Sequence, residues 1–442
     1  MAIQLSDHFT YRKLLRFTLP AIAMMIFTSV YGVVDGFFVS NFVGKTPFAA
    51  VNFVMPFLMI LGSLGFMFGT GGCALVSKTM GEGDRDRANR LFSMLVYVSL
   101  ALGILIALLG ILFIRPIVAF LGAEGEMLDY CVTYSTIILI ALPAFMLQIE
   151  FQSFFTAAEK PQLGLWITVL SGVVNMLLDL LLVGVFAFGI VGAALATAIS
   201  QLIGGIVPLF YFASKREKAL SLTRLTLDLP ALVRTCANGS SELMSNISMS
   251  LVGILYNVQL MKYEGENGVA AYGVLMYVSM IFLAAFIGYI IGTSPIISYH
   301  YGAGNTGELK NILSKSLRII TVTSLAMLGL GELLAEPLSA IFVSYDQSLY
   351  DLTLRGFFFY SFSFLFCGIA IFGSGFFTAL NNGLVSAIIS FLRTLVFQIV
   401  AVLVFPLIWE IDGIWLSIVV AEFMAAFITL LFLIGMRRRY RY

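Results

Sequence analysis

Six ionisable side chains lie inside apolar stretches of this 442-residue chain, where a charge is costly and is kept mainly for function or for pairing. They are Asp35, Glu150, Asp179, Glu242, Arg393 and Glu422. Asn175 lies four residues before Asp179, so the two share a helix face. Thr197 lies on the next apolar stretch, after a tight turn at 189–192. The sequence therefore predicts that four oxygen-bearing side chains converge: Asp35, Asn175, Asp179 and Thr197.

Two neighbouring carboxylates in a low-dielectric environment cannot both stay charged cheaply, so at least one is expected to take up a proton. Such a pair would serve as a proton carrier. The same oxygens can also ligate a hard monovalent cation such as sodium, and the residue types do not distinguish the two. A third interpretation is a hydrogen-bonded polar knot that only holds the first, fifth and sixth helices together.

The elements that must position these residues are membrane helices. Hydrophobic residues make up 60% of the chain, charged residues 11%, and the mean hydropathy is +1.00, which indicates an integral membrane protein. Apolar runs of about 20 residues or more are long enough to cross roughly 30 Å of hydrocarbon as helices, and the alternating segments of a barrel are absent. Twelve runs are predicted as spans: 14–40, 47–77, 90–114, 127–157, 162–185 and 189–212, then 231–260, 268–299, 312–335, 352–380, 384–408 and 413–436.

The chain also repeats itself. The segment at 154–157 returns at 376–379, 222 residues later, and Gly71–Gly83 echoes Gly292–Gly304 with an offset of 221. Because 221 is half of the chain length, one ancestral half was duplicated in tandem. The predicted fold is all-α and polytopic, with twelve transmembrane helices in two six-helix lobes related by a pseudo-two-fold axis along the membrane normal.

The duplication provides an internal control on the acidic residues. The offset of 221 places Tyr256 opposite Asp35, and the region opposite Asp179 is the apolar segment 401–403. A residue needed only for folding one lobe would tend to appear in both copies. The asymmetry therefore indicates a specialised ion site in the first lobe.

Basic residues predict the orientation, because Lys and Arg in short loops favour the cytoplasmic side. Twenty of the 25 fall on the side that holds both termini, which predicts cytoplasmic termini. The lobe boundary is predicted in the basic linker near 214–227, giving lobes 1–218 and 219–442. No cleavable signal peptide is expected, because the first apolar run continues straight into the repeat.

Residues with other chemistry give weak signals. The small residues Gly69, Gly71 and Ala74 imitate a dinucleotide fingerprint, but they lie in a hydrophobic helix with no preceding strand. His8 and His300 lack partners at ligand spacing, and the four cysteines show neither a close pair nor metal-ligand spacing. We therefore expect no enzyme activity, no cofactor, and no metal beyond a coupling sodium ion.

Across nearly its whole length the chain resembles the multidrug and toxic compound extrusion (MATE) transporters. The resemblance rests on the segment 32–39 around Asp35, on 81–84 at the end of the second run, and on Pro20 fifteen residues before Asp35. It also rests on the cation-site spacing of Asn175, Asp179 and Thr197. The chain looks closer to the MepA-like and DinF-like branch than to the sodium-dependent NorM-like members.

The resemblance implies a V-shaped, multi-pass exporter in the bacterial cytoplasmic membrane. It would exchange cationic or amphipathic drugs for protons, or for sodium, by alternating access. Its partners would be small organic molecules and the lipid bilayer, with no nucleic acid, and it would act as a monomer. Residues expected to handle substrate or protons are Glu150, Gln148, Tyr31, Tyr256 and Met276, with Gln152 completing a polar neighbourhood around Glu150.

Other expectations concern the remaining intramembrane residues. Glu242 corresponds to a helix-seven acid of NorM-like members, but the tenth run lacks any acid, so a sodium site is not expected in the second lobe. Arg393 and Glu422 are predicted to form a structural pair. Pro20 is either a hinge of the first helix or a proline tolerated near the helix start.

Two rival functions remain. A lipid-linked precursor flippase of the same superfamily would need basic groups for a pyrophosphate, yet acids outnumber the one intramembrane arginine five to one. A channel or a non-transporting receptor belongs to another class, and neither needs duplicated lobes around a buried acid pair.

Overall fold

The first half of the chain folds into a bundle of long helices. The structure, a computed structural model, describes residues 3–214, 219–344 and 346–442. The first bundle contains α1 (Tyr11–Phe42), α2 (Lys45–Gly81), α3 (Arg85–Phe120), α4 (Gly125–Ala157), α5 (Pro161–Leu178), the π-helical segment η1 (Asp179–Val185) and α6 (Gly189–Ala213). We call these elements the first lobe.

The second half forms an equivalent bundle, the second lobe. It contains α7 (Leu229–Gly302), α8 (Thr306–Val343), α9 (Gln347–Ser361), α10 (Phe364–Ala379), α11 (Gly383–Phe391), the π-helical segment η2 (Leu392–Val396), α12 (Phe397–Val404) and α13 (Pro406–Tyr440). The predicted lobe boundary lies between residues 218 and 219. Because residues 215–218 lie outside the described residues, this boundary stays a prediction.

The described helices account for twelve membrane crossings. Ten helices are long and apolar enough to cross a bilayer, and the pair α9 and α10, bent by 48°, supplies an eleventh span. With 74 residues, α7 is too long for one crossing, and Gly265 breaks it in the left-handed region at φ 62°. The two parts of α7 are therefore separate spans, and the prediction of twelve helices in two lobes is confirmed.

The repeated glycine segments end one helix and start the next in both lobes. Gly83 and Gly304 have φ of 90° and 67°, a backbone conformation that glycine adopts without steric cost. The following residues, Asp84 and Asn305, accept backbone N–H groups at the starts of α3 and α8. The duplicated sequence thus encodes the same turn and helix cap twice.

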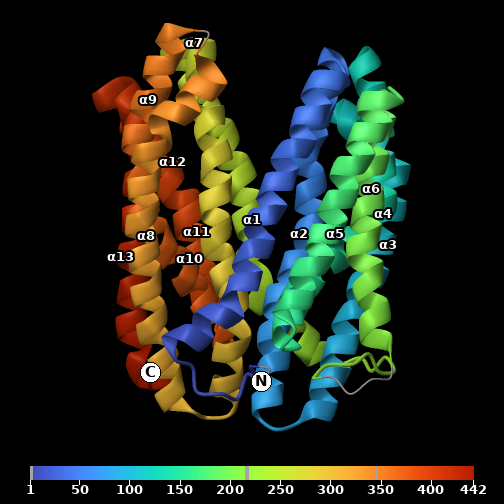
Figure 1. The fold of residues 1–442 in the computed structure, drawn as a ribbon, viewed down its shortest axis with the longest axis vertical. Helices are drawn as coiled ribbons and strands as arrows, with labels where there is room; N and C mark the ends of the chain where they lie inside the picture. The colour runs from blue at the N-terminus through green and yellow to red at the C-terminus, as the bar shows by residue number, and fades with distance from the viewer. Residues whose placement is uncertain (1–2, 215–218, 345) are drawn as a thin grey trace.

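The two lobes form a V. Figure 1 shows the blue-to-green first lobe and the yellow-to-red second lobe diverging toward one end of the molecule, while both chain termini lie at the other end. At the end with the termini, α2 and α7 approach so closely that side chains would not fit between them. A methyl group on Gly71 would overlap the carbonyl oxygen of Thr235, and one on Gly239 would overlap that of Met67. We call this α2–α7 contact the seam.

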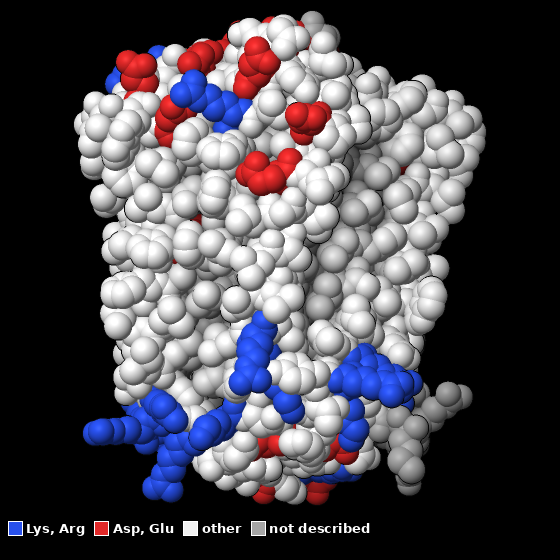
Figure 2. Space-filling view, turned by 60° about the vertical axis from the view of Figure 1, so that its left-hand side comes forward, with Lys and Arg blue, Asp and Glu red and all other residues white. Residues whose placement is uncertain are grey.

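Charged side chains gather at the two ends of the molecule. Figure 2 shows Lys and Arg side chains toward the end that carries the termini and many Asp and Glu side chains toward the opposite end. On this face, a broad band between them is largely free of charge, as expected for a surface in contact with lipid.

Candidate functional site

The four predicted oxygen-bearing side chains come together inside the first lobe. Asp35 of α1, Asn175 of α5, Asp179 of η1 and Thr197 of α6 form one cluster, which we call the acid site. Thr197 Oγ1 donates a hydrogen bond to Asp35 Oδ1 at 3.4 Å. Asn175 and Asp179 also lie within hydrogen-bonding reach of Asp35.

A π-helical turn positions the second carboxylate. The α-helix of α5 ends at Leu178, and the backbone N–H of Asp179 bonds to the carbonyl oxygens of Asn175 and Met176. From Asp179 the chain continues as η1, a wider helical turn of a kind that often occurs at functional sites. The helical spacing of four residues keeps Asn175 and Asp179 on one face.

The oxygen atoms of the acid site can accept more hydrogen bonds than the neighbouring donor groups supply. Asp179 is fully buried, and among the described residues neither of its carboxylate oxygens accepts a hydrogen bond from a neutral donor. Asn175 Oδ1 is also buried without a partner. A hydrogen bond between the Asp35 and Asp179 carboxyl groups requires that one of them holds a proton. The residues therefore suit either a shared proton or a small cation bound by oxygens.

Tyr31 and Gln148 form a polar layer beside the acid site. Gln148 Nε2 donates to Ser171 Oγ at 3.4 Å, and Ser171 Oγ donates to the Ser200 carbonyl oxygen at 2.6 Å. Tyr31 lies within hydrogen-bonding reach of Gln148. Tyr31 and Ser171 each lie one helical turn before a residue of the acid site, so this layer extends the site along the lobe.

The two serines of this layer, Ser171 and Ser200, were not predicted from the sequence. A signal was present for one of them, because Ser171 lies four residues before Asn175 and so shares its helix face.

Glu150 does not join Gln148, contrary to the expected shared neighbourhood. Two residues apart on α4, the side chains point in nearly opposite directions, because each residue rotates about 100° around the axis. Glu150 is fully buried, neither of its oxygens has a hydrogen-bond partner among the described residues, and Ser99 of α3 is a polar side chain beside it. A methyl group on Gly69 of α2 would lie 3.1 Å from Glu150 Cα. Glu150 is thus enclosed by α2, α3 and α4.

Tyr256 and Met276 belong to an aromatic cluster in the second lobe, separate from Tyr31. Tyr256 Oη donates to Gln398 Oε1 at 2.7 Å, and its ring stacks on Tyr272 with centroids 5.4 Å apart. Met276 Sδ lies 3.9 Å from Tyr360 Oη. The structure does not bring these residues together with Tyr31 into one contact.

The second lobe also contains the intramembrane arginine. Arg393 Nε of η2 donates to Glu422 Oε2 of α13 at 2.8 Å, and both side chains are largely buried. Glu242 of α7 lies close enough to Arg393 for a charge interaction. One guanidinium is therefore placed among two carboxylates.

Pro20 lies where α1 meets the second lobe. The proline is buried inside α1, which runs unbroken from Tyr11 to Phe42. A methyl group on Gly292 would lie 3.0 Å from Thr18 Cα, and one on Gly288 would lie 2.5 Å from Ile22 Cα. The hydrogen bond that Pro20 cannot donate therefore falls in the part of α1 that packs against α7.

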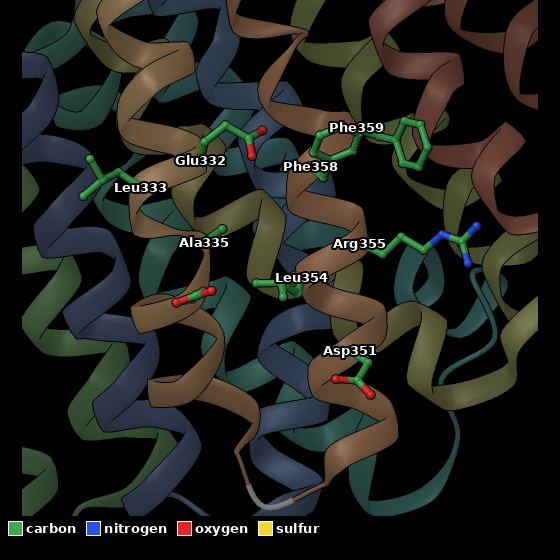
Figure 3. A pocket seen from close by; sticks show the side chains of 9 residues that line it. Glu332, Leu333, Ala335, Asp351, Leu354, Arg355, Phe358 and Phe359 are labelled. Atoms are coloured by element: carbon green, nitrogen blue, oxygen red, sulfur yellow. The ribbon is translucent and has the colours of Figure 1, made fainter.

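The second lobe also contains a pocket that was not predicted from the sequence. It has a volume of about 740 Å³ between α8 and α9, and Figure 3 shows Glu332, Asp351 and Arg355 on its walls beside Phe358 and Phe359. Arg355 forms an ion pair with Asp412 of α13. None of the predicted site residues lines this pocket.

The fold and the acid site together define a class: a two-lobed, twelve-helix membrane protein with a pair of neighbouring carboxyl groups inside one lobe. The MatE family model matches residues 20–181 and again 243–404, with starts and ends both 223 residues apart. The chain belongs to the MatE family.

The chain is similar to curated multidrug export proteins of staphylococci. It is 25% identical over 432 residues to the multidrug export protein MepA of Staphylococcus saprophyticus, covering 97% of this chain and 94% of that protein. It is 23% identical over 430 residues to MepA of Staphylococcus aureus strain NCTC 8325, with the same coverage. The predicted resemblance to MATE transporters is confirmed.

Solved MATE structures share the fold. An outward-facing multidrug resistance MATE family transporter of the MOP superfamily superposes with a TM-score of 0.92 at 22% identity, covering 100% of this chain and 98% of that one. A MATE structure in the straight conformation gives 0.92 at 22% identity, covering 98% and 97%. One in the bent conformation gives 0.88 at 22% identity, covering 99% and 96%.

Proposed function

We propose that this protein is a multidrug efflux antiporter of the bacterial cytoplasmic membrane. It exports cationic or amphipathic organic compounds and takes up a coupling ion at the acid site. The observation that carries the proposal is the pair of carboxyl groups inside the first lobe, the half-buried Asp35 of α1 and the fully buried Asp179 of the π-helical turn η1. Export of drugs is supported by the similarity to MepA proteins over 97% of the chain.

Protons are the favoured coupling ion, with sodium as the alternative. Among the described residues neither Asp179 oxygen accepts a hydrogen bond from a neutral donor, so a proton held between the half-buried Asp35 and the buried Asp179 supplies the missing hydrogen bond. Sodium would need all four side chains of the acid site as ligands.

The mechanism follows from the location of Asp35 on α1, the helix that also packs against the second lobe near Pro20. A proton that enters from the end where the lobes diverge lowers the charge of the carboxyl pair from two negative charges to one, and it changes the hydrogen bonds between α1, α5 and α6. Because α1 contacts α7 at Gly288 and Gly292, a shift of α1 reaches the other lobe. Alternating access then couples proton entry to drug release, and proton release on the cytoplasmic side resets the transporter.

The drug is expected to bind between the lobes. Tyr31 of the first lobe and the cluster of Tyr256, Met276 and their neighbours in the second lobe provide aromatic and thioether groups, which adapt to ligands of different shapes. Both termini are expected in the cytoplasm, and a single chain is expected to suffice.

Ethidium efflux from proteoliposomes tests this function. The wild type, Asp35→Asn and Asp179→Asn are compared under a proton gradient and, separately, under a sodium gradient. We expect the proton gradient alone to drive the wild type and both variants to lose efflux. Asp351→Asn, an exposed acid on α9, is the matched control and should pump normally.

Three results would contradict the proposal in different ways. Efflux driven only by the sodium gradient would show that sodium, and not the proton, is the coupling ion. Variants that pump as well as the wild type would leave the acids with a structural role. A wild type that moves no ethidium under either gradient would favour the flippase.

A further inference from the structure

A basic pocket lies at the end of the molecule that carries the termini. It has a volume of about 350 Å³ and lies between the start of α1 and the first turns of α8. Its walls consist of Tyr11, Gly307, Lys310, Asn311, Ser314, Lys315 and Arg318. Three cationic side chains therefore surround one cavity.

Two of the three cations bind neutral oxygen atoms of the protein. Lys315 Nζ donates to the Phe9 carbonyl oxygen at 2.6 Å, and Arg318 Nη1 donates to Tyr11 Oη at 3.0 Å. In the part of the chain that the structure describes, no carboxylate lies within 4.0 Å of Lys310, Lys315 or Arg318. The pocket is therefore positively charged and suited to an anion.

The pocket lies at the depth of the lipid headgroups. With 38 residues, α8 is about 57 Å long at 1.5 Å per residue, well beyond the roughly 30 Å of hydrocarbon in a bilayer. Because Lys310, Lys315 and Arg318 lie on its first turns, this end of α8 is the one that we place in the headgroup layer. Figure 2 shows Lys and Arg side chains gathered toward this end of the molecule.

The face of α8 that lines the pocket continues into an apolar, exposed surface. Lys310, Ser314 and Arg318 follow one another at intervals of four residues, and Val322 continues the same row. Val322 is 66% exposed and Leu325, one turn on, is 54% exposed. An anion bound in the pocket with an acyl chain attached would lay that chain along these residues.

We propose that this pocket binds the phosphate headgroup of an anionic phospholipid. The lipid phosphate accepts hydrogen bonds from Lys310, Lys315 and Arg318, and the acyl chain lies against Val322 and Leu325. The apolar continuation of the pocket favours a phospholipid over free phosphate.

The lipid site is connected to a segment that crosses between the lobes. The backbone N–H of Leu5 donates to Glu159 Oε1 of the first lobe at 2.7 Å. Four residues later, Phe9 is bound to α8 of the second lobe, through Glu308 at 2.9 Å and through Lys315. A bound phosphate reduces the repulsion among the pocket cations and so stabilises Lys315 in this contact. Lipid binding therefore favours the conformation in which the lobes meet at this end.

Lipid binding by the purified chain tests the site. The wild type in nonionic detergent is titrated with dioctanoyl phosphatidylglycerol, and bound lipid is counted by native mass spectrometry. Dioctanoyl phosphatidylcholine and inorganic phosphate are the comparison ligands. The pocket variant is Lys310→Gln/Arg318→Gln, and the control is Arg85→Gln/Arg87→Gln, which removes two exposed charges from the start of α3 at the same end.

We expect phosphatidylglycerol to bind the wild type and the control alike, and the pocket variant about 25-fold more weakly, from roughly fivefold for each lost charge. Ser314→Glu, which places a negative charge in the pocket, should give the same loss if the double variant does not fold. Equal binding by the pocket and control variants would overturn the proposal. So would equal affinity for phosphatidylcholine, or competition by inorganic phosphate at the same concentration, which would assign the pocket to free phosphate.

Discussion

Gly81 of α2 and Gly302 of α7 lie against the backbone of each other's helix. A methyl group on Gly81 would overlap the carbonyl oxygen of Tyr299, and one on Gly302 would overlap that of Lys78. Because Gly81 and Gly302 are 221 residues apart, as are Lys78 and Tyr299, the contact is reciprocal. Such reciprocity is expected across a two-fold axis, so the seam between the lobes follows from the duplication.

Gly81→Ala should open the seam. The added methyl group has only backbone to push against, and overpacking of this kind costs about 1–3 kcal/mol. We expect Cys236, which is half-buried on α7 next to the seam residue Thr235, to react with a maleimide about tenfold faster in a chain whose other cysteines are replaced by alanine. Rapid-quench labelling followed by mass spectrometry measures the rate.

Gly253→Ala is the control for this change, since nothing lies within 4 Å of a methyl group there. It should leave the labelling rate unchanged. Equal rates in Gly81→Ala and in the wild type would show that the α2–α7 contact adjusts without opening.

Much of this fold could be predicted from sequence, for identifiable reasons. Hydrophobic length determines the spans, and the offset of 221 pairs Gly83 and Asp84 with Gly304 and Asn305, which form the same turn and cap. The spacing of Asn175 and Asp179 gave the acid site, because four residues along a helix return to one face.

The directions of side chains in neighbouring helices could not be predicted. Glu150 and Gln148 are two residues apart on α4, yet they face different helices, and only the packing of α2, α3 and α5 around α4 decides which polar groups each meets. The basic pocket was also missed, because Tyr11 and Arg318 are 307 residues apart. Contacts of such separation leave no local pattern.

Thr197→Val should weaken ion coupling, while Thr197→Ser should retain it. The hydroxyl group donates to Asp35 Oδ1 at 3.4 Å, and a hydrogen bond of this length contributes no more than a typical one, about 0.5–1.5 kcal/mol. We expect proton-driven ethidium efflux to fall about three- to tenfold in Thr197→Val and to stay near the wild type in Thr197→Ser. A valine variant that pumps as fast as the serine variant would remove Thr197 from the coupling machinery.

Glu150→Gln should leave drug affinity unchanged while slowing efflux. The carboxyl group is fully buried among α2, α3 and α4, so a drug between the lobes does not contact it in this conformation. A role in proton handling would therefore affect the transport rate alone. Ethidium affinity, measured by fluorescence polarisation, should stay within about twofold, which is under 0.5 kcal/mol. A large loss of affinity would instead indicate that Glu150 contacts the drug.

Arg393→Met should destabilise the second lobe more than the double variant Arg393→Met/Glu422→Leu. The single change leaves Glu422 buried without its partner, and breaking a buried pair in this way costs about 3–5 kcal/mol. Removing both charges is often close to neutral. Thermal unfolding in detergent, followed by tryptophan fluorescence, should therefore give a clearly lower midpoint for the single variant, with recovery in the double. A single variant as stable as the double would show that Glu422 finds another partner, for which Glu242 could not serve because it is also acidic.

Glu308→Ala should release the segment that crosses between the lobes. The carboxylate accepts hydrogen bonds from His8 Nδ1 at 2.7 Å and from the Phe9 backbone N–H at 2.9 Å, and it also binds Asn311. Losing these contacts, at about 0.5–1.5 kcal/mol each, should loosen the lobes at the end with the termini. We expect Cys236 to label about tenfold faster than in the wild type.

Lys13→Gln is the control for Glu308→Ala. It removes the exposed ion pair with Asp7 at 3.3 Å but keeps the contacts of Phe9, so the labelling rate should not change. If Lys13→Gln accelerated labelling as much as Glu308→Ala, loss of any charge at this end would account for the effect. If neither variant accelerated labelling, the contacts of residues 5–9 with the two lobes would not help to hold the lobes together, and this function would belong to the seam glycines.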